Sequence, residues 1–367
     1  MNKNIKSCKN CLNEVQKKNF ECDVCLAVKS RLASIHSFTD NPDSILHDLK
    51  KKYKRPLSKY DVCIGISGGV DSCMVATLAG EAGLKAKLIH FDNGWNTQKA
   101  NKNIFSICEK YGFKLDTRIM DWKIFKSLQR SFFLSSVPDI ELVTDHAIFA
   151  TMTKELSLGE VPIFLNGSNF STEHGLNLGR IVWNKLDILN IIAINKKFEN
   201  ISLKNYPKTN PLSWAKYRFF NRKSRIDLPL NNYWYKRNTA ISYMNEKFGF
   251  EDYGFKHEES VFTKVYQRVV LKRKFNCIKV LPHINAQIRN KEFSKEEGEN
   301  LINSFIDDID LEQYEIEYVR QKLGFKSSEW EKILNEDPKC HSDYQNMGLL
   351  IEPIMKILSK LNLRAME

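Results

Sequence analysis

The chain has 367 residues and a net charge of +12, and 42% of its residues are apolar, 27% charged and 11% aromatic. This composition excludes a disordered chain and allows two or three domains with buried cores. No apolar run nears the ~20 residues that span a bilayer. Residues 1–4 begin no signal peptide, so we expect a cytoplasmic protein without membrane insertion.

Four cysteines with the spacing C-x2-C-x10-C-x2-C come first in the chain: Cys8, Cys11, Cys22 and Cys25. In a cytoplasmic protein two such pairs indicate one tetrahedral Zn2+ site, because each C-x2-C turn aims two thiolates at one ion. A dithiol redox pair would explain one C-x2-C but not two. Four thiolates leave the ion no open position for chemistry, so residues 1–31 are predicted to form a structural zinc knuckle.

A polar, lysine-rich segment at residues 32–59 is predicted to be a helical linker. From residue 60, short apolar runs alternate with amphipathic stretches, which is the pattern of strands and helices in turn. We expect strands at residues 61–66, 88–91, 114–119, 161–165 and 188–194. We expect helices at residues 71–82, 97–111 and 145–158.

This alternation predicts an α/β domain over residues 60–200, with a parallel, doubly wound sheet covered by helices on both faces. Such sheets bind ligands at the carboxyl ends of their strands. Beyond residue 200 the alternation fades into longer helical patterns. Residues 201–367 are therefore predicted to form a mostly helical domain that contacts substrate or a partner.

The first predicted strand-to-helix turn carries a motif typical of anion binding. It reads Ser67, Gly68, Gly69, Val70, Asp71 and Ser72. Two glycines let the backbone approach an anion closely, while successive N–H groups and the helix dipole face negative charge. The two serines add hydroxyl donors, and the aspartate can help to hold Mg2+. The motif lacks the Gly-Lys-Ser/Thr of a Walker A loop.

This motif resembles that of the PP-loop ATP pyrophosphatases, which release pyrophosphate from ATP while adenylating a substrate oxygen. Together with the knuckle, further segments resemble the N-acetyl sugar amidotransferases, over nearly the whole chain. These segments are residues 91–96, 121–122, 128–130, 145–147 and 252–260, with Asn169, Thr172 and Glu173. The resemblance implies a PP-loop fold of the adenine-nucleotide alpha-hydrolase type. It also implies conversion of an acetamido to an acetamidino group in lipopolysaccharide, O-antigen or flagellar-glycan biosynthesis.

The resemblance implies roles for single residues. ATP would be bound by residues 67–72 and by Asp92, and Ser67, Asp71 and Ser72 would act in catalysis, with Asp71 holding Mg2+. His146 and His257 are candidates for proton transfer, and a hydrogen-bonded structural role is equally open for each. The substrate would be contacted by Asn93, Trp95, Asp145, Asn169, Thr172, Glu173, Lys256 and Glu258.

The implied chemistry explains these parts. An amide carbonyl is a poor electrophile, but adenylation of its oxygen creates a leaving group, AMP, that ammonia can displace. ATP, Mg2+ and a nucleotide-linked sugar are thus the expected ligands. No cysteine stands at the N-terminus or in a recognisable glutaminase triad. The resemblance implies that ammonia comes from glutaminase and barrel subunits similar to the two halves of imidazole glycerol phosphate synthase.

A rival interpretation is a PP-loop enzyme that modifies tRNA by adenylating a base carbonyl. Residues 196–237 hold eleven basic, two acidic and nine aromatic side chains, a mixture that RNA recognition uses. The same mixture suits the pyrophosphate and base of a nucleotide sugar. No C-x2-C lies within residues 60–200 to carry sulfur for thiolation, so nucleic acid is the less favoured partner. A binding module with an inactive ATPase relic conflicts with the intact motif.

Overall fold

The computed structural model describes residues 6–15, 20–158, 163–175, 181–211, 213, 225–307 and 310–348. Its centre is a five-stranded sheet in the order β5-β4-β3-β6-β7, in which every neighbouring pair is parallel. The strands are β3 (Val62–Gly65), β4 (Ala86–Asp92), β5 (Lys114–Ile119), β6 (Ile163–Leu165) and β7 (Arg225–Asp227). The parallel sheet predicted from the sequence is confirmed.

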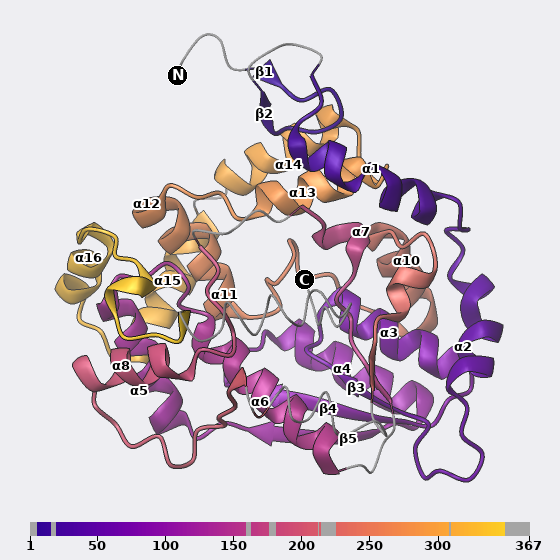
Figure 1. Cartoon of the computed structure of the whole chain (residues 1–367), viewed down its shortest axis with the longest axis horizontal. Helices are drawn as coiled ribbons and strands as arrows, with labels where there is room; N and C mark the ends of the chain where they lie inside the picture. Colours follow the sequence, from indigo (N-terminus) through magenta and orange to yellow (C-terminus); the bar gives the residue numbers. More distant parts are fainter. Residues whose placement is uncertain are drawn as a thin grey trace.

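Helices cover both faces of this sheet, as Figure 1 shows. On one face, Ile64 and Leu88 pack with four helices: α2 (Leu46–Tyr53), α3 (Val70–Glu81), α4 (Gln98–Tyr111) and α10 (Arg237–Phe248). On the other face, Cys63 and Ile89 pack against α6 (Leu142–Leu158). Successive strand residues alternate between the two faces, and both faces are buried. The central strands β3 and β6 therefore read as short unbroken apolar runs, whereas the edge strand β5 carries Lys114, Asp116 and Arg118.

One predicted strand is wrong. Residues 188–194 belong to α8 (Ile188–Lys197), which begins where the Asp187 side chain accepts a hydrogen bond from the Asn190 N–H group. Ile191 and Ile194 are buried in the core, whereas Ile192 is 41% exposed, so burial follows the helical period. A run of seven residues that is apolar except for Asn190 fits a strand or a buried helix equally, and here packing on α5 (Trp122–Ser135) decides.

The fifth strand of the sheet is β7, which pairs with β6 and lies beyond residue 200. A boundary at that residue would separate β7 from its sheet. The strand has three residues, and Arg225 and Asp227 at its ends are polar. The next element is a short 3-10 helix, η2 (Pro229–Asn232).

The C-terminal part is helical, as predicted, and packs on α5 and α8 through a second apolar cluster. Its elements are α11 (Val261–Val265), a π-helical turn η3 (Tyr266–Val270), α12 (Leu271–Phe275), α13 (Val280–Arg289), α14 (Lys295–Asp307), α15 (Asp310–Leu323), α16 (Ser327–Asn335) and the 3-10 helix η4 (His341–Asp343). A short helix, α7 (Phe170–Glu173), follows β6 and contacts α13.

The four cysteines lie between a small hairpin and a helix at the N-terminus. The hairpin pairs β1 (Lys6–Ser7) with β2 (Glu14–Val15), and α1 (Asp23–His36) follows. This unit lies beside α13 and α14 at the top of Figure 1, and η1 (Pro42–Ile45) with α2 connects it to the sheet. Among the described helices, none is both long and apolar enough to cross a membrane.

Candidate active site

The glycine-rich loop at residues 67–72 connects β3 to the N-terminus of α3, as the sequence predicts. Gly68 has φ +84°, and a Cβ there would collide with the carbonyl oxygen of Ala100, so both backbone and space require glycine. The Ser67 N–H group donates to Ser72 Oγ, and the two hydroxyl oxygens lie 3.2 Å apart. The Ser72 hydroxyl donates to the Gly69 carbonyl at 3.0 Å. The loop thus forms a closed turn at a helix N-terminus, the arrangement that binds phosphate.

Asp71 lies at the start of α3 and is held by two side chains from distant segments. Its Oδ1 accepts the Tyr235 hydroxyl at 2.5 Å, and its Oδ2 accepts Lys256 Nζ at 2.6 Å. Burial alone would raise the pKa of Asp71, but the Lys256 ammonium and these two hydrogen bonds outweigh it and lower the pKa. Asp71 is therefore ionised at neutral pH, as a ligand for Mg2+ must be.

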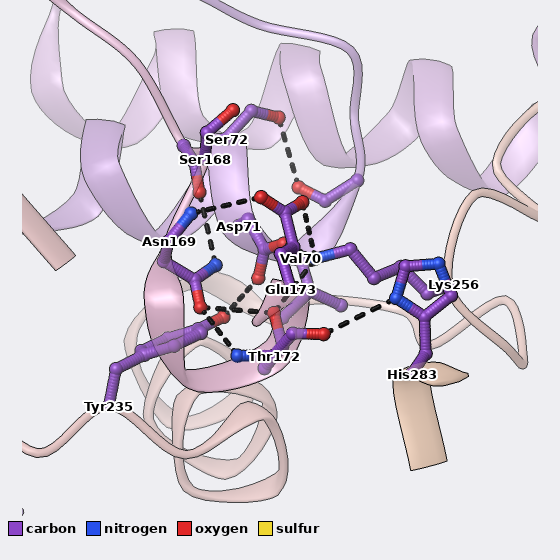
Figure 2. Close-up of polar contacts among 12 residues, drawn as sticks. Val70, Asp71, Ser72, Ser168, Asn169, Thr172, Glu173, Tyr235, Lys256 and His283 are labelled. Atoms are coloured by element: carbon purple, nitrogen blue, oxygen red, sulfur yellow. Dashed lines mark hydrogen bonds and ion pairs between the residues drawn. The ribbon is translucent and has the colours of Figure 1, made fainter. Parts of the chain in front are cut away.

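Lys256 joins the loop to α7. Its Nζ lies 2.8 Å from Thr172 Oγ1 and 2.8 Å from Glu173 Oε1, besides its contact with Asp71. Burial alone would lower the pKa of Lys256, but the two carboxylates outweigh it and raise the pKa. Figure 2 shows these side chains converging from α3, α7 and the segment that carries Lys256.

Asn169 shapes α7 for this contact. Its side-chain Oδ1 accepts hydrogen bonds from the Thr172 N–H group at 2.9 Å and from the Thr172 hydroxyl at 3.0 Å. Its own N–H group donates to Glu173 Oε2 at 3.1 Å (Figure 2). Asparagine at an N-cap satisfies N–H groups that the helix leaves without partners. Four predicted substrate residues, Asn169, Thr172, Glu173 and Lys256, thus form one network with Asp71.

His257 lies next to Lys256, with φ +70°, and its ring is 5.5 Å from that of His283. Burial, and then the positive charges of Lys256 and Lys279, lower the pKa of His257 to about 3. His283 Nδ1 lies 3.3 Å from the carbonyl oxygen of Thr172, which only accepts (Figure 2). Because its pKa is lowered to about 3, His257 is neutral at physiological pH.

His146, by contrast, has a structural environment. Its Nδ1 donates to the Lys185 carbonyl at 2.8 Å, its Nε2 accepts the Thr209 N–H group at 3.3 Å, and its ring stacks on Tyr206. Burial lowers its pKa to about 4. Both ring nitrogens are used, so the structural alternative weighed for His146 fits the structure better than proton transfer. The neighbouring Asp145 pairs with Lys185 at 2.8 Å.

Two other predicted substrate residues are enclosed. The Trp95 side chain is 1% exposed, and its indole N–H donates to Gln129 Oε1 at 2.9 Å. Glu258 is 3% exposed and accepts Arg268 Nε at 2.6 Å. The structure thus gives both side chains internal partners and brings neither into the Asp71 network.

Asp92 ends β4 and Asn93 follows it, at the same edge of the sheet as the loop. Asp92 Oδ1 accepts the Gly94 N–H group at 2.8 Å, and Asn93 Oδ1 accepts the Trp95 N–H group at 3.2 Å. A pocket of about 1390 Å³ lies along β5 and α6 and reaches Phe91 near the end of β4, and its lining includes the basic Lys204 but no residue of the loop at 67–72. The loop, Asp92 and Asn93 lie at the carboxyl edge of the sheet. The position fits the rule that open parallel sheets bind ligands at their carboxyl ends.

Sequence reasoning missed three residues at the loop. Glu259 Oε1 lies 3.3 Å from Ser67 Oγ, and burial together with Asp71 raises the pKa of Glu259. Tyr235 binds Asp71, and the Tyr253 hydroxyl accepts the N–H group of Val70 at 2.9 Å. Glu259 and Tyr253 lie within residues 252–260, the segment that carries part of the family resemblance, but no local pattern ties them to the loop.

The four cysteine sulfurs have the spacing of a mononuclear metal site. Cys8 and Cys25, and Cys11 and Cys22, lie 3.7 Å apart, and Cys11 and Cys25 lie 3.6 Å apart. Tetrahedral Zn–S bonds of about 2.3 Å place sulfurs about 3.8 Å apart. In a four-iron cluster each thiolate binds a different iron, which needs wider separations. The residues therefore fit one tetrahedral ion.

Two family models match separate parts of the chain. Residues 61–153 match the "Queuosine biosynthesis protein QueC" model, and residues 259–361 match the "LPS biosynthesis protein WbpG-like, C-terminal domain" model. No curated protein matches the chain.

Among solved structures, the U34-tRNA thiolase NcsA from Methanococcus maripaludis aligns with a TM-score of 0.35 and 13% identity, over 87% of this chain and 89% of its own. The NH3-dependent NAD synthetase from Campylobacter jejuni aligns with a TM-score of 0.29 and 16% identity, over 56% of this chain and 91% of its own. With TM-scores this low, these likenesses establish no property of the chain.

The loop geometry and the two family models agree with one another. The first model covers the strand, loop and helix that hold Asp71, and the second begins at Glu259, whose carboxylate faces the same loop. The chain is a PP-loop protein of the ATP pyrophosphatase type with a WbpG-like lipopolysaccharide-biosynthesis domain, and it resembles the N-acetyl sugar amidotransferases.

Proposed function

We propose that the protein is an ATP-dependent amidotransferase that converts the acetamido group of an N-acetyl sugar to an acetamidino group. The supporting observation is that segments of both matched families meet at one site. Glu259, the first residue of the WbpG-like segment, contacts Ser67 of the loop. Lys256, three residues before that segment, contacts Asp71 of the loop. The proposed ATP site thus lies beside the first residue of the WbpG-like segment.

In the proposed first step, the acetamido oxygen attacks the α-phosphorus of ATP, and pyrophosphate leaves. The loop at residues 67–72 would bind the departing pyrophosphate through backbone N–H groups and the hydroxyls of Ser67 and Ser72. Mg2+, which Asp71 would hold, neutralises phosphate charge. Lys256 adds a fixed positive charge beside Asp71.

In the second step, ammonia attacks the imidate carbon, AMP leaves with the former amide oxygen, and the added nitrogen loses a proton to give the amidine. His257 is neutral and could accept that proton only when its cationic surroundings change. Ammonia is mostly protonated at neutral pH because aliphatic ammonium groups have pKa values near that of lysine. We therefore propose delivery by glutaminase and barrel subunits, with free ammonium effective at raised pH.

The sugar is proposed to be nucleotide-linked. The pocket along β5 and α6 is large enough for such a ligand and includes the basic side chains of Lys154, Lys204 and Lys208. The four-Cys site is proposed to hold a structural Zn2+, because its sulfur spacing fits one ion and all four positions are thiolates.

The test incubates the protein with Mg-ATP, ammonium and N-acetyl sugars, free and nucleotide-linked, and measures pyrophosphate and product mass. We expect pyrophosphate only with a sugar substrate, and a product in which an NH group has replaced oxygen. Lys256→Met is expected to lose activity, and Lys326→Met, at a capping position of α16, to keep it. Pyrophosphate formation with tRNA and with none of the sugars would instead favour the tRNA-modifying interpretation.

The rival interpretation rests on the basic, aromatic segment at residues 196–237, part of which the structure describes. Residues 212 and 214–224 of its basic, aromatic segment lie outside the described residues. Trp234, from the same segment, packs on His36 and beneath Lys236, and its indole N–H donates to the Asn290 carbonyl. That ring has an internal role.

A further inference from the structure

Hydrogen bonds connect the four-Cys unit directly to α13. Asn285, a fully buried residue of α13, accepts the Leu12 N–H group at 2.7 Å and donates to Asn13 Oδ1 at 2.8 Å. The Asn13 side chain also donates to Cys22 Sγ at 3.4 Å. One buried amide of α13 therefore contacts the backbone next to Cys11 and, through Asn13, a metal-ligating sulfur.

The same helix holds α7 through residues on either side of Asn285. His283 lies 3.3 Å from the Thr172 carbonyl. Arg289, one turn after Asn285, donates through Nε to His174 Nε2 at 2.9 Å and through Nη2 to the His174 carbonyl at 3.3 Å. His174 is the C-cap of α7, so α13 fixes both the middle and the end of α7.

The knuckle also reaches α7 directly through α1, the helix that contains Cys25. Arg31 lies over the Phe170 ring at 5.7 Å. A Cβ at Gly175, just after α7, would collide with the Val24 side chain, so the two segments pack in close contact. Displacement of α1 would therefore be felt at α7.

At its other side α7 supplies two of the three oxygens around Lys256 Nζ, and Asp71 of the loop supplies the third. A continuous series of buried and partly buried contacts thus runs from the cysteines to the loop. We propose that metal binding at the four-Cys site and nucleotide binding at the loop are coupled through α13, with Asn285 as a positioning residue.

This inference rests on the proposed ATP site. Coupling between binding sites is reciprocal: each ligand raises the affinity for the other by the same factor, with typical factors of about 5 to 150. We therefore expect nucleotide to raise the affinity for Zn2+ by about 5-fold or more. Removal of zinc should weaken nucleotide binding by that same factor.

The experiment uses the full chain with Zn2+, Mg2+ and α,β-methylene ATP, in which the bond to be broken is blocked. Calorimetry first measures binding of the nucleotide to the zinc-loaded protein. Competition with a zinc chelator then gives the zinc affinity with and without nucleotide. In Asn285→Ala, we expect nucleotide still to bind, but the zinc affinity should be the same with and without bound nucleotide. Asn285→Asp, which keeps the acceptor for the Leu12 N–H group, should recover part of the response to nucleotide.

Lys295→Ala is the matched control, since Lys295 of α14 donates to the Cys8 carbonyl at 2.7 Å. It should weaken zinc binding and leave the response to nucleotide intact. A wild-type zinc affinity that is equal with and without bound nucleotide would overturn the coupling and leave the proposed function standing. If nucleotide raised the zinc affinity of Asn285→Ala as much as that of the wild type, Asn285 would have no role in the coupling. If the zinc-loaded protein bound no nucleotide, the proposed function and this inference would both be wrong.

Discussion

Replacement of Lys256 by methionine tests the centre of the site. Its ammonium lies between two carboxylates, and the side chains of Lys256, Asp71 and Glu173 are 9%, 17% and 21% exposed. Removing one partner of a buried ion pair costs about 3–5 kcal/mol because the other charge is left without compensation. Both carboxylates keep some contact with solvent, so we expect about 3 kcal/mol of lost stability, the lower end of that range.

The assay is urea unfolding of wild type and Lys256→Met over a range of pH, together with pyrophosphate release. Asp71 has a depressed pKa, so its stabilisation is present above the unfolded value of about 4 and is lost as pH falls through the folded value. The difference in free energy of unfolding between Lys256→Met and wild type should therefore become smaller below pH ~4.

Lys236→Met is the control, because Lys236 forms an outer ion pair with Asp40, which is 51% exposed. Surface pairs contribute about 1 kcal/mol or less. A Lys256→Met variant as stable as this control, with a difference from wild type independent of pH, would refute the assignment of Lys256 as the ion that stabilises Asp71.

Three further predictions concern the loop and the knuckle. Asp71→Asn should still fold, with some loss of stability because Lys256 loses one of its two carboxylates, and should reduce pyrophosphate release by at least about 100-fold; equal rates would exclude a role for this carboxylate. Gly68→Ala should lose at least about 2 kcal/mol in thermal unfolding, since φ +84° and the Ala100 carbonyl both oppose a side chain; unchanged stability would contradict the loop geometry. Elemental analysis should find zinc in wild type and none in Cys22→Ser, which loses a ligand of a site contributing on the order of 10 kcal/mol.

The parts predictable from sequence are those in which local pattern and local structure coincide. The strand β3, the glycines of the loop at residues 67–72 and the helix α3 follow one another in the sequence, and the conformation of the loop follows from this order. Residues 188–194 contain one polar residue, Asn190, and a single polar position defines no period, so helix and strand could not be told apart. The strand β7 has three residues, and only its pairing with β6 defines it.

The site could be predicted in its residue types but not in its partners. Lys256 contacts Asp71, which lies 185 positions away, and nothing local to either residue encodes that contact. His146 and Glu258 have the side chains of proton carriers and substrate ligands, yet Lys185, Thr209 and Arg268 occupy their polar atoms. Residue type gives the chemistry a side chain is capable of, and tertiary packing decides whether it remains available.

The pairing of β7 with β6 has a consequence for how the chain is synthesised. Leu165 ends β6 and Arg225 begins β7, so the edge of β6 is without its partner strand until about 60 further residues have been made. At about 5–20 residues per second, that interval lasts roughly 3–12 seconds on the ribosome. An unpaired, apolar strand edge invites pairing with other nascent chains. Truncation at residue 200 would make this transient state permanent, so a fragment ending there should aggregate.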